Sequence, residues 1–409
     1  MVVKGIGENL GLLVGPPKPA PDGNIRGWRI VAVVLAVVLP LVLSSCRGSA
    51  KEAAAATEKA GAVSKVVQAA KQAEVADPLM GDWQGNWVLS DGGQSGGLVA
   101  QVIALGKGMY RVSLFEEFDR KIPAITVLEG GLQDGSVHFL GPGKYEEYVF
   151  KIDATLEKDK LAGRFEGKDS GGQDVSGTFK LEKTVRLSPP NVSVGGAKPP
   201  AGAVVLFDGK NFDQWERIGS KAGKKEVRWK LLPGGAMEVA QGGGSIVTKK
   251  KFKDFELHLE FRTPFMPDAR GQGRGNSGVY LQGRYEIQIL DSYGLEGLDN
   301  ECGGIYTVAA PLVNMCAPPM QWQTYDITFR SPRLDNAGGK LRDALLTVVH
   351  NGVKIHDEIK IPGPTGGALD NNEGQPGGIY LQDHGNPVQF RNIWLVEQNG
   401  GRGAYRPIR

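Results

Sequence analysis

The segment YEIQILD, residues 285–291, carries three polar residues whose spacing suits acid–base chemistry. In an extended strand Glu286 and Gln288 point to one face, and Asp291 joins them if the strand bulges or turns. A positioned carboxyl group acts as a general acid or base, and an amide orients hydroxyl groups. We therefore expect Glu286 and Asp291 to be catalytic and Gln288 to bind substrate. A solvated polar strand face is the alternative.

His384, in the segment QDHG, is the second candidate for proton transfer. An imidazole titrates near neutral pH, and the glycine beside it loosens the loop enough to approach a ligand. Gln382 in the same loop is expected to contact substrate. The other four histidines lie in strand patterns or beside a turn and are expected to be structural or solvated: His138, His258, His350 and His356.

Two arginines and an asparagine are candidates for holding substrate oxygens. Arg274 and Asn276 lie in the glycine-rich segment GQGRGNSG, which lacks the lysine and spacing of a phosphate-binding P-loop. Arginine supplies fixed donors for a negatively charged oxygen, and asparagine can bind hydroxyl groups. Arg391 either pairs with Glu286, touches substrate or forms a structural ion pair.

The elements that carry these residues are expected to be β-strands. The chain has 409 residues, of which 59 are glycine without a three-residue period, and short alternating apolar runs follow one another between glycine-bearing turns. This pattern is typical of an all-β protein and excludes collagen. The net charge of +3 gives no electrostatic case for nucleic-acid binding.

Composition divides the chain into folding units and connecting segments. Eight or so short strands in residues 78–187 predict a small antiparallel barrel or sandwich with a binding or spacing role. Residues 204–398 predict a larger β-sandwich, because Phe255, Leu257, Leu259 and Phe261 alternate with polar residues. The remaining segments are an alanine-rich helical or flexible spacer (47–77), a Pro/Gly linker (188–203) and a tail (399–409).

The N-terminal residues 1–46 resemble a bacterial lipoprotein signal. An apolar run, residues 30–43, follows two arginines and is too short as a helix for a hydrocarbon core of about 30 Å. Leu43-Ser44-Ser45-Cys46 then resembles a lipobox, which implies cleavage before Cys46 and its lipidation. We expect a membrane-anchored lipoprotein of the cell envelope, facing the periplasm or the exterior. A signal-anchor helix with an incidental cysteine is the alternative.

Seven sequence blocks occur in one order between residues 204 and 397: LFDGKNFDQWE, DFELHLEFR, RGNSGVYLQGRYEIQILD, ECGGIYTVAAP, PPMQWQTYDITFR, VVHNGVKIHD and GGIYLQDHGNPVQFRNIWL. Together they resemble the 3-keto-disaccharide hydrolase domain family. The resemblance implies a concanavalin-like jelly roll and cleavage of glycosides whose C3 hydroxyl has been oxidised to a ketone.

That substrate class sets the chemistry required. A C3 ketone acidifies the C2 proton, so a base can form an enolate that expels the aglycone from C1, after which water adds. The site needs a base, a donor for the enolate oxygen and an acid for the leaving oxygen. A separate sugar-oxidising dehydrogenase must make the ketone, because the chain has no dinucleotide-binding fingerprint.

The remaining expectations concern thiols, cofactors and other functions. Cys302 and Cys316 can form a disulfide in an oxidising compartment or brace the site as free thiols. No cofactor is expected, with a divalent cation such as calcium as the alternative. A non-catalytic carbohydrate-binding protein is the second function considered, because jelly rolls host lectins and enzymes alike. A scaffold whose β-domains bind protein is the third.

Overall fold

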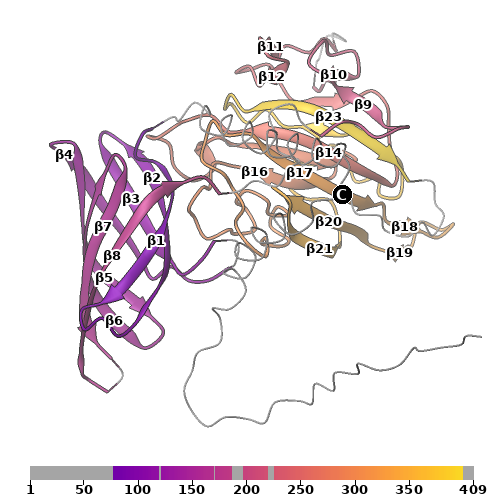
Figure 1. Ribbon diagram of the computed structural model, residues 1–409. Helices are drawn as coiled ribbons and strands as arrows, with labels where there is room; N and C mark the ends of the chain where they lie inside the picture. The colour runs from indigo at the N-terminus through magenta and orange to yellow at the C-terminus, as the bar shows by residue number, and fades with distance from the viewer. Residues whose placement is uncertain (1–76, 119–120, 170, 187–196, 220–224, 399–409) are drawn as a thin grey trace, which may run out of the picture. The chain divides into compact units, whose positions relative to one another are not determined.

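The computed structural model describes residues 77–118, 121–169, 171–186, 197–219 and 225–398 (Figure 1). These residues form β-strands and one short 3₁₀ helix, η2 (Gly271–Gly273), so the all-β prediction is confirmed. No helix among them is long and apolar enough to cross a bilayer. The predicted signal segment with Cys46, the C-terminal tail and nearly all of the alanine-rich spacer lie outside the described residues.

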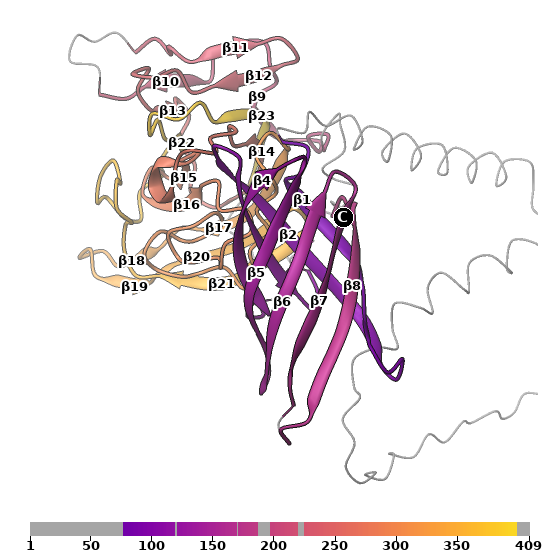
Figure 2. The same ribbon diagram turned by 90° about the vertical axis from the view of Figure 1, so that its left-hand side faces the viewer.

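Residues 81–184 form a closed antiparallel barrel in which each strand pairs with the next and β1 pairs with β8 (Figure 2). Of the two architectures expected here, the structure is the barrel. Its strands are β1 (Gly81–Leu89), β2 (Ser95–Gly106), β3 (Met109–Phe115), β4 (Thr126–Gln133), β5 (Ser136–Tyr145), β6 (Tyr148–Glu157), β7 (Lys160–Lys168) and β8 (Asp174–Thr184).

Side chains fill the barrel interior, as in other small barrels. Every second residue of a strand points inward, and Trp83, Phe139, Leu156 and Leu181 are fully buried. Glycine is required where an aromatic ring lies against a neighbouring strand. A Cβ atom on Gly177 would lie 2.3 Å from the Phe165 ring.

The strands after the barrel form a sandwich of two antiparallel sheets, with a separate two-stranded ribbon of β18 (Arg333–Leu334) and β19 (Lys340–Arg342). The five-stranded sheet has the order β10 (Trp215–Arg217), β13 (Ile246–Thr248), β22 (Tyr380–Leu381), β15 (Ser277–Leu281) and β16 (Tyr285–Ile289). The eight-stranded sheet has the order β11 (Lys230–Leu232), β12 (Ala236–Glu238), β23 (Gln389–Glu397), β14 (Phe255–Arg262), β17 (Gln323–Arg330), β20 (Ala344–His350) and β21 (Val353–Ile361), and β9 (Val204–Phe207) also pairs with β23.

The core of the sandwich forms where the predicted alternation places it. Phe255, Leu257, Leu259 and Phe261 on β14 are at most 1% exposed. They share one apolar cluster with Val279 and Ile287 of the five-stranded sheet. The two sheets therefore pack face to face, and the residues between these core positions point away from the core.

The β20–β21 hairpin has the two-residue turn that its sequence predicts. Asn351 and Gly352 have φ angles of 49° and 78°. Both angles lie in the left-handed region that a type I′ turn requires, and Asn-Gly adopts this region most readily.

Candidate active site

The candidate site lies on the side of the five-stranded sheet that faces away from the core. In the β15–β16 hairpin Tyr280 is paired with Glu286, and Gly278 with Gln288. Tyr380 of β22 is the partner of Tyr280 on its other side. We call this surface, with Tyr280, Tyr380, Glu286 and Gln288, the tyrosine face.

Glu286 is the carboxyl group of the tyrosine face and is only 3% exposed. Burial raises its pKa to about 7, although Tyr280, within hydrogen-bonding reach, acts in the opposite direction. The backbone N–H of Glu286 donates to the Thr365 hydroxyl at 2.9 Å. Such a carboxyl group can both accept and donate a proton near neutral pH, which is what acid–base catalysis requires.

Tyr280 is a residue that the sequence analysis did not select. Its ring stacks on Tyr380 with centroids 4.4 Å apart. Its hydroxyl donates to the Gly366 carbonyl at 2.9 Å and accepts from Gln382 Nε2 at 3.2 Å. Burial, and then the nearby Glu286 carboxyl, raise the pKa of Tyr280 above its usual range, so it stays protonated. The short Gln282–Arg284 connection predicts a hairpin, and pairing its two strands would have placed Tyr280 opposite Glu286.

Amide side chains lie at one end of the tyrosine face. Gln288 Nε2 donates to Gln272 Oε1 at 3.0 Å, and Asn276 Nδ2 donates to the same oxygen at 3.0 Å. Gln272 is in η2 and had not been predicted. The Oδ1 atom of Asn276 is buried without a hydrogen-bond partner. The structure thus brings together Glu286, Gln288 and Asn276 from the predicted set, with Gln272 holding the two amides in place.

The predicted loop of Gln382 and His384 begins beside Tyr280. Gln382 contacts the Tyr280 hydroxyl, and its backbone N–H donates to the Gly278 carbonyl at 3.0 Å. His384, two residues further along, is exposed. Gln382 therefore belongs to the tyrosine face, and His384 is a solvent-facing residue of the loop that borders it.

Asp291 and Arg274 form a buried ion pair with each other. Arg274 Nε lies 2.6 Å from Asp291 Oδ2, and the two side chains are 6% and 1% exposed. Burial raises the pKa of Asp291, against the opposing effect of Arg274. Asp291 was expected to join Glu286 as a second acid–base group. It instead forms a structural ion pair, because the end of the strand turns Asp291 toward Arg274.

Arg391 does not pair with Glu286. It lies on β23 of the eight-stranded sheet, where its Nε is 2.5 Å from Glu260 Oε2 and its guanidinium lies 4.1 Å from the centre of the Trp322 ring. Of the three alternatives, the structure shows a structural ion pair, and contact of Arg391 with substrate stays a prediction. Glu260 and its neighbour His258 are fully buried, although the strand pattern placed them on a polar outer face.

Cys302 and Cys316 are free and buried. Their thiols are within hydrogen-bonding distance of each other, and Cys302 Sγ lies 3.3 Å from the Tyr325 hydroxyl. The adjoining residues support β16 from the side, since Gly303 N–H donates to the Gln288 carbonyl at 3.0 Å. The thiols thus lie beside the strand that carries Glu286, and their pairing stays a prediction.

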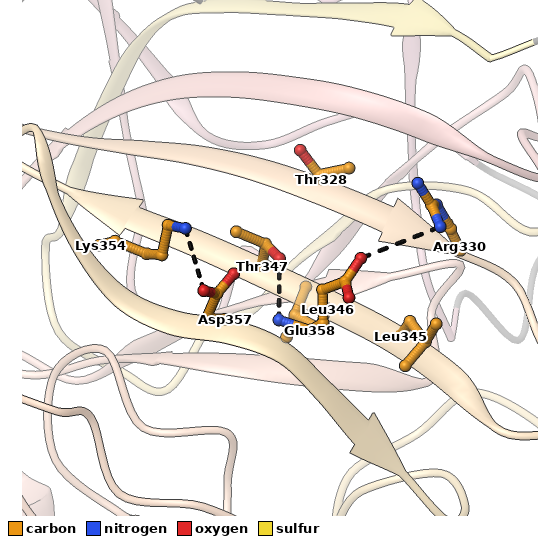
Figure 3. A pocket seen from close by; sticks show the side chains of 8 residues that line it. All are labelled: Thr328, Arg330, Leu345, Leu346, Thr347, Lys354, Asp357 and Glu358. Atoms are coloured by element: carbon orange, nitrogen blue, oxygen red, sulfur yellow. Dashed lines mark hydrogen bonds and ion pairs between the residues drawn. The ribbon is translucent and has the colours of Figure 1, made fainter. Parts of the chain in front are cut away.

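A shallow hollow of about 140 Å³ lies elsewhere, over β17, β20 and β21 (Figure 3). Its charged side chains form ion pairs, with Lys354 Nζ 3.0 Å from Asp357 on the same strand and Arg330 4.0 Å from Glu358. None of the predicted site residues lines this hollow. The tyrosine face remains the candidate active site.

Comparison with known proteins supports the family resemblance. Residues 202–396 match the family model of the 3-keto-alpha-glucoside-1,2-lyase-like domain. The C-terminal domain belongs to this family. A 3-keto-disaccharide hydrolase of Bacteroides thetaiotaomicron is 27% identical over 238 residues, which cover 47% of this chain and 77% of that protein.

The lyase-like domain is also similar to solved structures. Two Parabacteroides distasonis proteins, both assigned provisionally as glycosyl hydrolases, are 36% and 19% identical, with TM-scores of 0.44 and 0.37. They cover 49% and 48% of this chain, which in turn covers 85% and 95% of theirs. The family prediction is confirmed, and the matched residues of the family model begin after the barrel.

Proposed function

We propose that the lyase-like domain is a glycosidase that cleaves 3-keto-glycosides, with Glu286 as its acid–base group. The observation that carries the proposal is a buried carboxyl group with a pKa of about 7 on a strand face that also presents tyrosine and amide groups. The family and the printed name of the Bacteroides relative support the substrate class.

The reaction would begin at the C2 proton of the oxidised sugar. The Glu286 carboxylate takes this proton, and the C–H electron pair forms an enolate on the C3 oxygen. The enolate then re-forms the ketone as the C1–O bond breaks, and the leaving oxygen takes a proton from Glu286 or from His384. Water adding to the resulting C1–C2 double bond completes hydrolysis. Release of the unsaturated sugar before water adds makes the overall reaction an elimination.

The other groups of the tyrosine face would hold the sugar. Gln288, Asn276 and Gln382 offer amide donors and acceptors for ring hydroxyls, and Tyr280 is a neutral donor beside Glu286. A dehydrogenase acting upstream would supply the ketone. A lipid-anchored position in the cell envelope is part of the same proposal, and it depends on Cys46.

The test is to incubate the purified protein with a 3-keto-glucoside and with the unoxidised glucoside. Release of the aglycone from the oxidised sugar alone is expected. Tight calorimetric binding of an unmodified glycan, with no turnover of either compound, would instead identify a carbohydrate-binding protein and overturn the enzyme assignment.

A further inference from the structure

Residues 363–370, GPTGGALD, lie over the tyrosine face, and we call this segment the strap. Thr365 N–H donates to the Arg284 carbonyl at 2.9 Å, and Leu369 N–H donates to the Gly283 carbonyl at 2.8 Å. Gly366 and Gly367 are exposed, whereas Tyr280 beneath them is 1% exposed. The strap is therefore a thin cover between solvent and the groups of the candidate site.

Glycine is required where the strap meets Tyr280. Gly367 has a φ angle of 79°, and a Cβ atom there would lie 2.5 Å from the Tyr280 hydroxyl. The Gly366 carbonyl accepts the hydrogen bond of that hydroxyl at 2.9 Å. The hydrogen bond from Tyr280 to Gly366 thus joins the strap to a side chain that can respond to the charge of Glu286.

The Tyr280 hydroxyl has one proton and two acceptors within reach. Its oxygen already accepts from Gln382, so its proton can go to the Gly366 carbonyl or to Glu286. When Glu286 is neutral, its own proton can point to Tyr280, and Tyr280 donates to Gly366. When Glu286 is ionised, it becomes the stronger acceptor, because hydrogen bonds to a charged group are about twice as strong as neutral ones.

We propose that Tyr280 is a positioning residue that couples the protonation state of Glu286 to closure of the strap. Ionised Glu286 takes the Tyr280 hydrogen bond, the Gly366 carbonyl loses its partner, and the strap opens more often. Neutral Glu286 returns the hydrogen bond to Gly366 and favours the closed strap. The carboxylate that could act as a base would thus be the form that admits substrate, a consequence that rests on the proposed function.

The other titratable groups that act on this relay are tyrosines and carboxylates. Tyr380 on β22 and Tyr306 beside the strap both act on Tyr280, and Asp383 acts on Tyr380. Burial raises the pKa of Tyr380 above its usual value. In the strap, Asp370 pairs with Arg284 at 2.6 Å. Partial burial acts to raise the pKa of Asp370, but the hydrogen bond from Arg284 opposes it and the pKa is lowered. Among the described residues, no basic side chain shifts the pKa of Glu286.

Hydrogen exchange of the full-length protein, measured without substrate between pH 5.5 and 8.5, tests the coupling. After correction for intrinsic exchange rates, protection of the Thr365 and Leu369 amides should fall about fivefold as the pH rises through about 7, the population change expected from one hydrogen bond of ordinary strength. Amides of the β14–β17 ladder should keep constant protection. A strap whose protection does not change with pH would overturn the proposal.

Three variants separate the relay from a general effect on folding. Glu286→Gln should hold the strap at its high protection at every pH, and Tyr280→Phe should hold it at the low level. Tyr380→Phe is the matched control, because its hydroxyl contacts Ser245 and it should keep the wild-type pH dependence. Wild-type pH dependence in Glu286→Gln or Tyr280→Phe would contradict the proposal. Because no substrate is used, the outcome is independent of whether Glu286 is catalytic.

Discussion

The Glu286 carboxyl lies directly over Gly278 of the neighbouring strand. A Cβ atom at Gly278 would be 2.2 Å from Glu286 Oε1, far inside van der Waals contact. The glycine is therefore what gives the carboxyl group its place on the tyrosine face.

Gly278→Ala is expected to displace the Glu286 carboxyl and lower kcat by at least tenfold while the sandwich stays folded. The effect follows from misplacing an acid–base group, which needs hydrogen-bonding distance to the proton it moves. Gly273→Ala is the control, because a Cβ atom there meets nothing within 4 Å. Steady-state kinetics with a 3-keto-glucoside, together with thermal melts, would check both. Equal kcat values in the two variants would contradict this role of Gly278.

Glu286→Gln is expected to lower kcat by about 10²- to 10⁴-fold, the usual contribution of general acid–base catalysis. Glu256→Gln serves as the control, because burial also raises the pKa of Glu256 but this residue lies on β14 of the other sheet. Comparable activity in the two variants would remove Glu286 from the mechanism.

His384→Ala is expected to lower kcat and to change the pH profile if this residue protonates the leaving oxygen. The exposed His138 of the barrel, which lies 2.6 Å from Asp153, provides the control His138→Ala. A good leaving group needs little protonation, so His384→Ala should lose less activity on substrates with acidic leaving groups than on substrates with poor ones. An equal loss on both kinds of substrate would show that His384 is not the acid.

The pKa of Glu286 also predicts how stability depends on pH. The folded value of about 7 lies above the ordinary value of 4.5, so the folded state holds a proton that the unfolded state releases. Stability should therefore fall as the pH rises from about 4.5 to about 7 and then level off, by about 3 kcal/mol for this group. Denaturant unfolding of the wild type and of Glu286→Gln across this range measures the difference. A constant difference between the two would contradict the raised pKa.

Oxidation with a small-molecule disulfide is expected to join Cys302 and Cys316, since their thiols already adjoin. The reaction forms one protein disulfide and releases two small thiols. In the chain-entropy model a closed loop of this size stabilises by about 3 kcal/mol. Non-reducing peptide mapping detects the bond, and thermal melts measure its effect. Cys302→Ser, treated in the same way, should show neither change, and a wild-type protein that stays reduced would refute the pairing.

The sequence alone determined the strand pattern and the geometry of one hairpin turn. Alternation along YEIQILD placed Glu286 and Gln288 on one face, and Asn-Gly at residues 351–352 determined a hairpin turn. These features are predictable because strand periodicity and turn geometry depend on residues that are close together in the chain.

Only the tertiary structure decided which polar groups meet. The partner of Tyr280, Gly366, is 86 residues away, and the partner of Arg391 is Glu260, 131 residues away. Such pairs depend on strand order, on register and on loops crossing a sheet, none of which local periodicity encodes. The same long-range packing buries Glu286 and raises its pKa, which turns an ordinary polar strand residue into a candidate acid–base group.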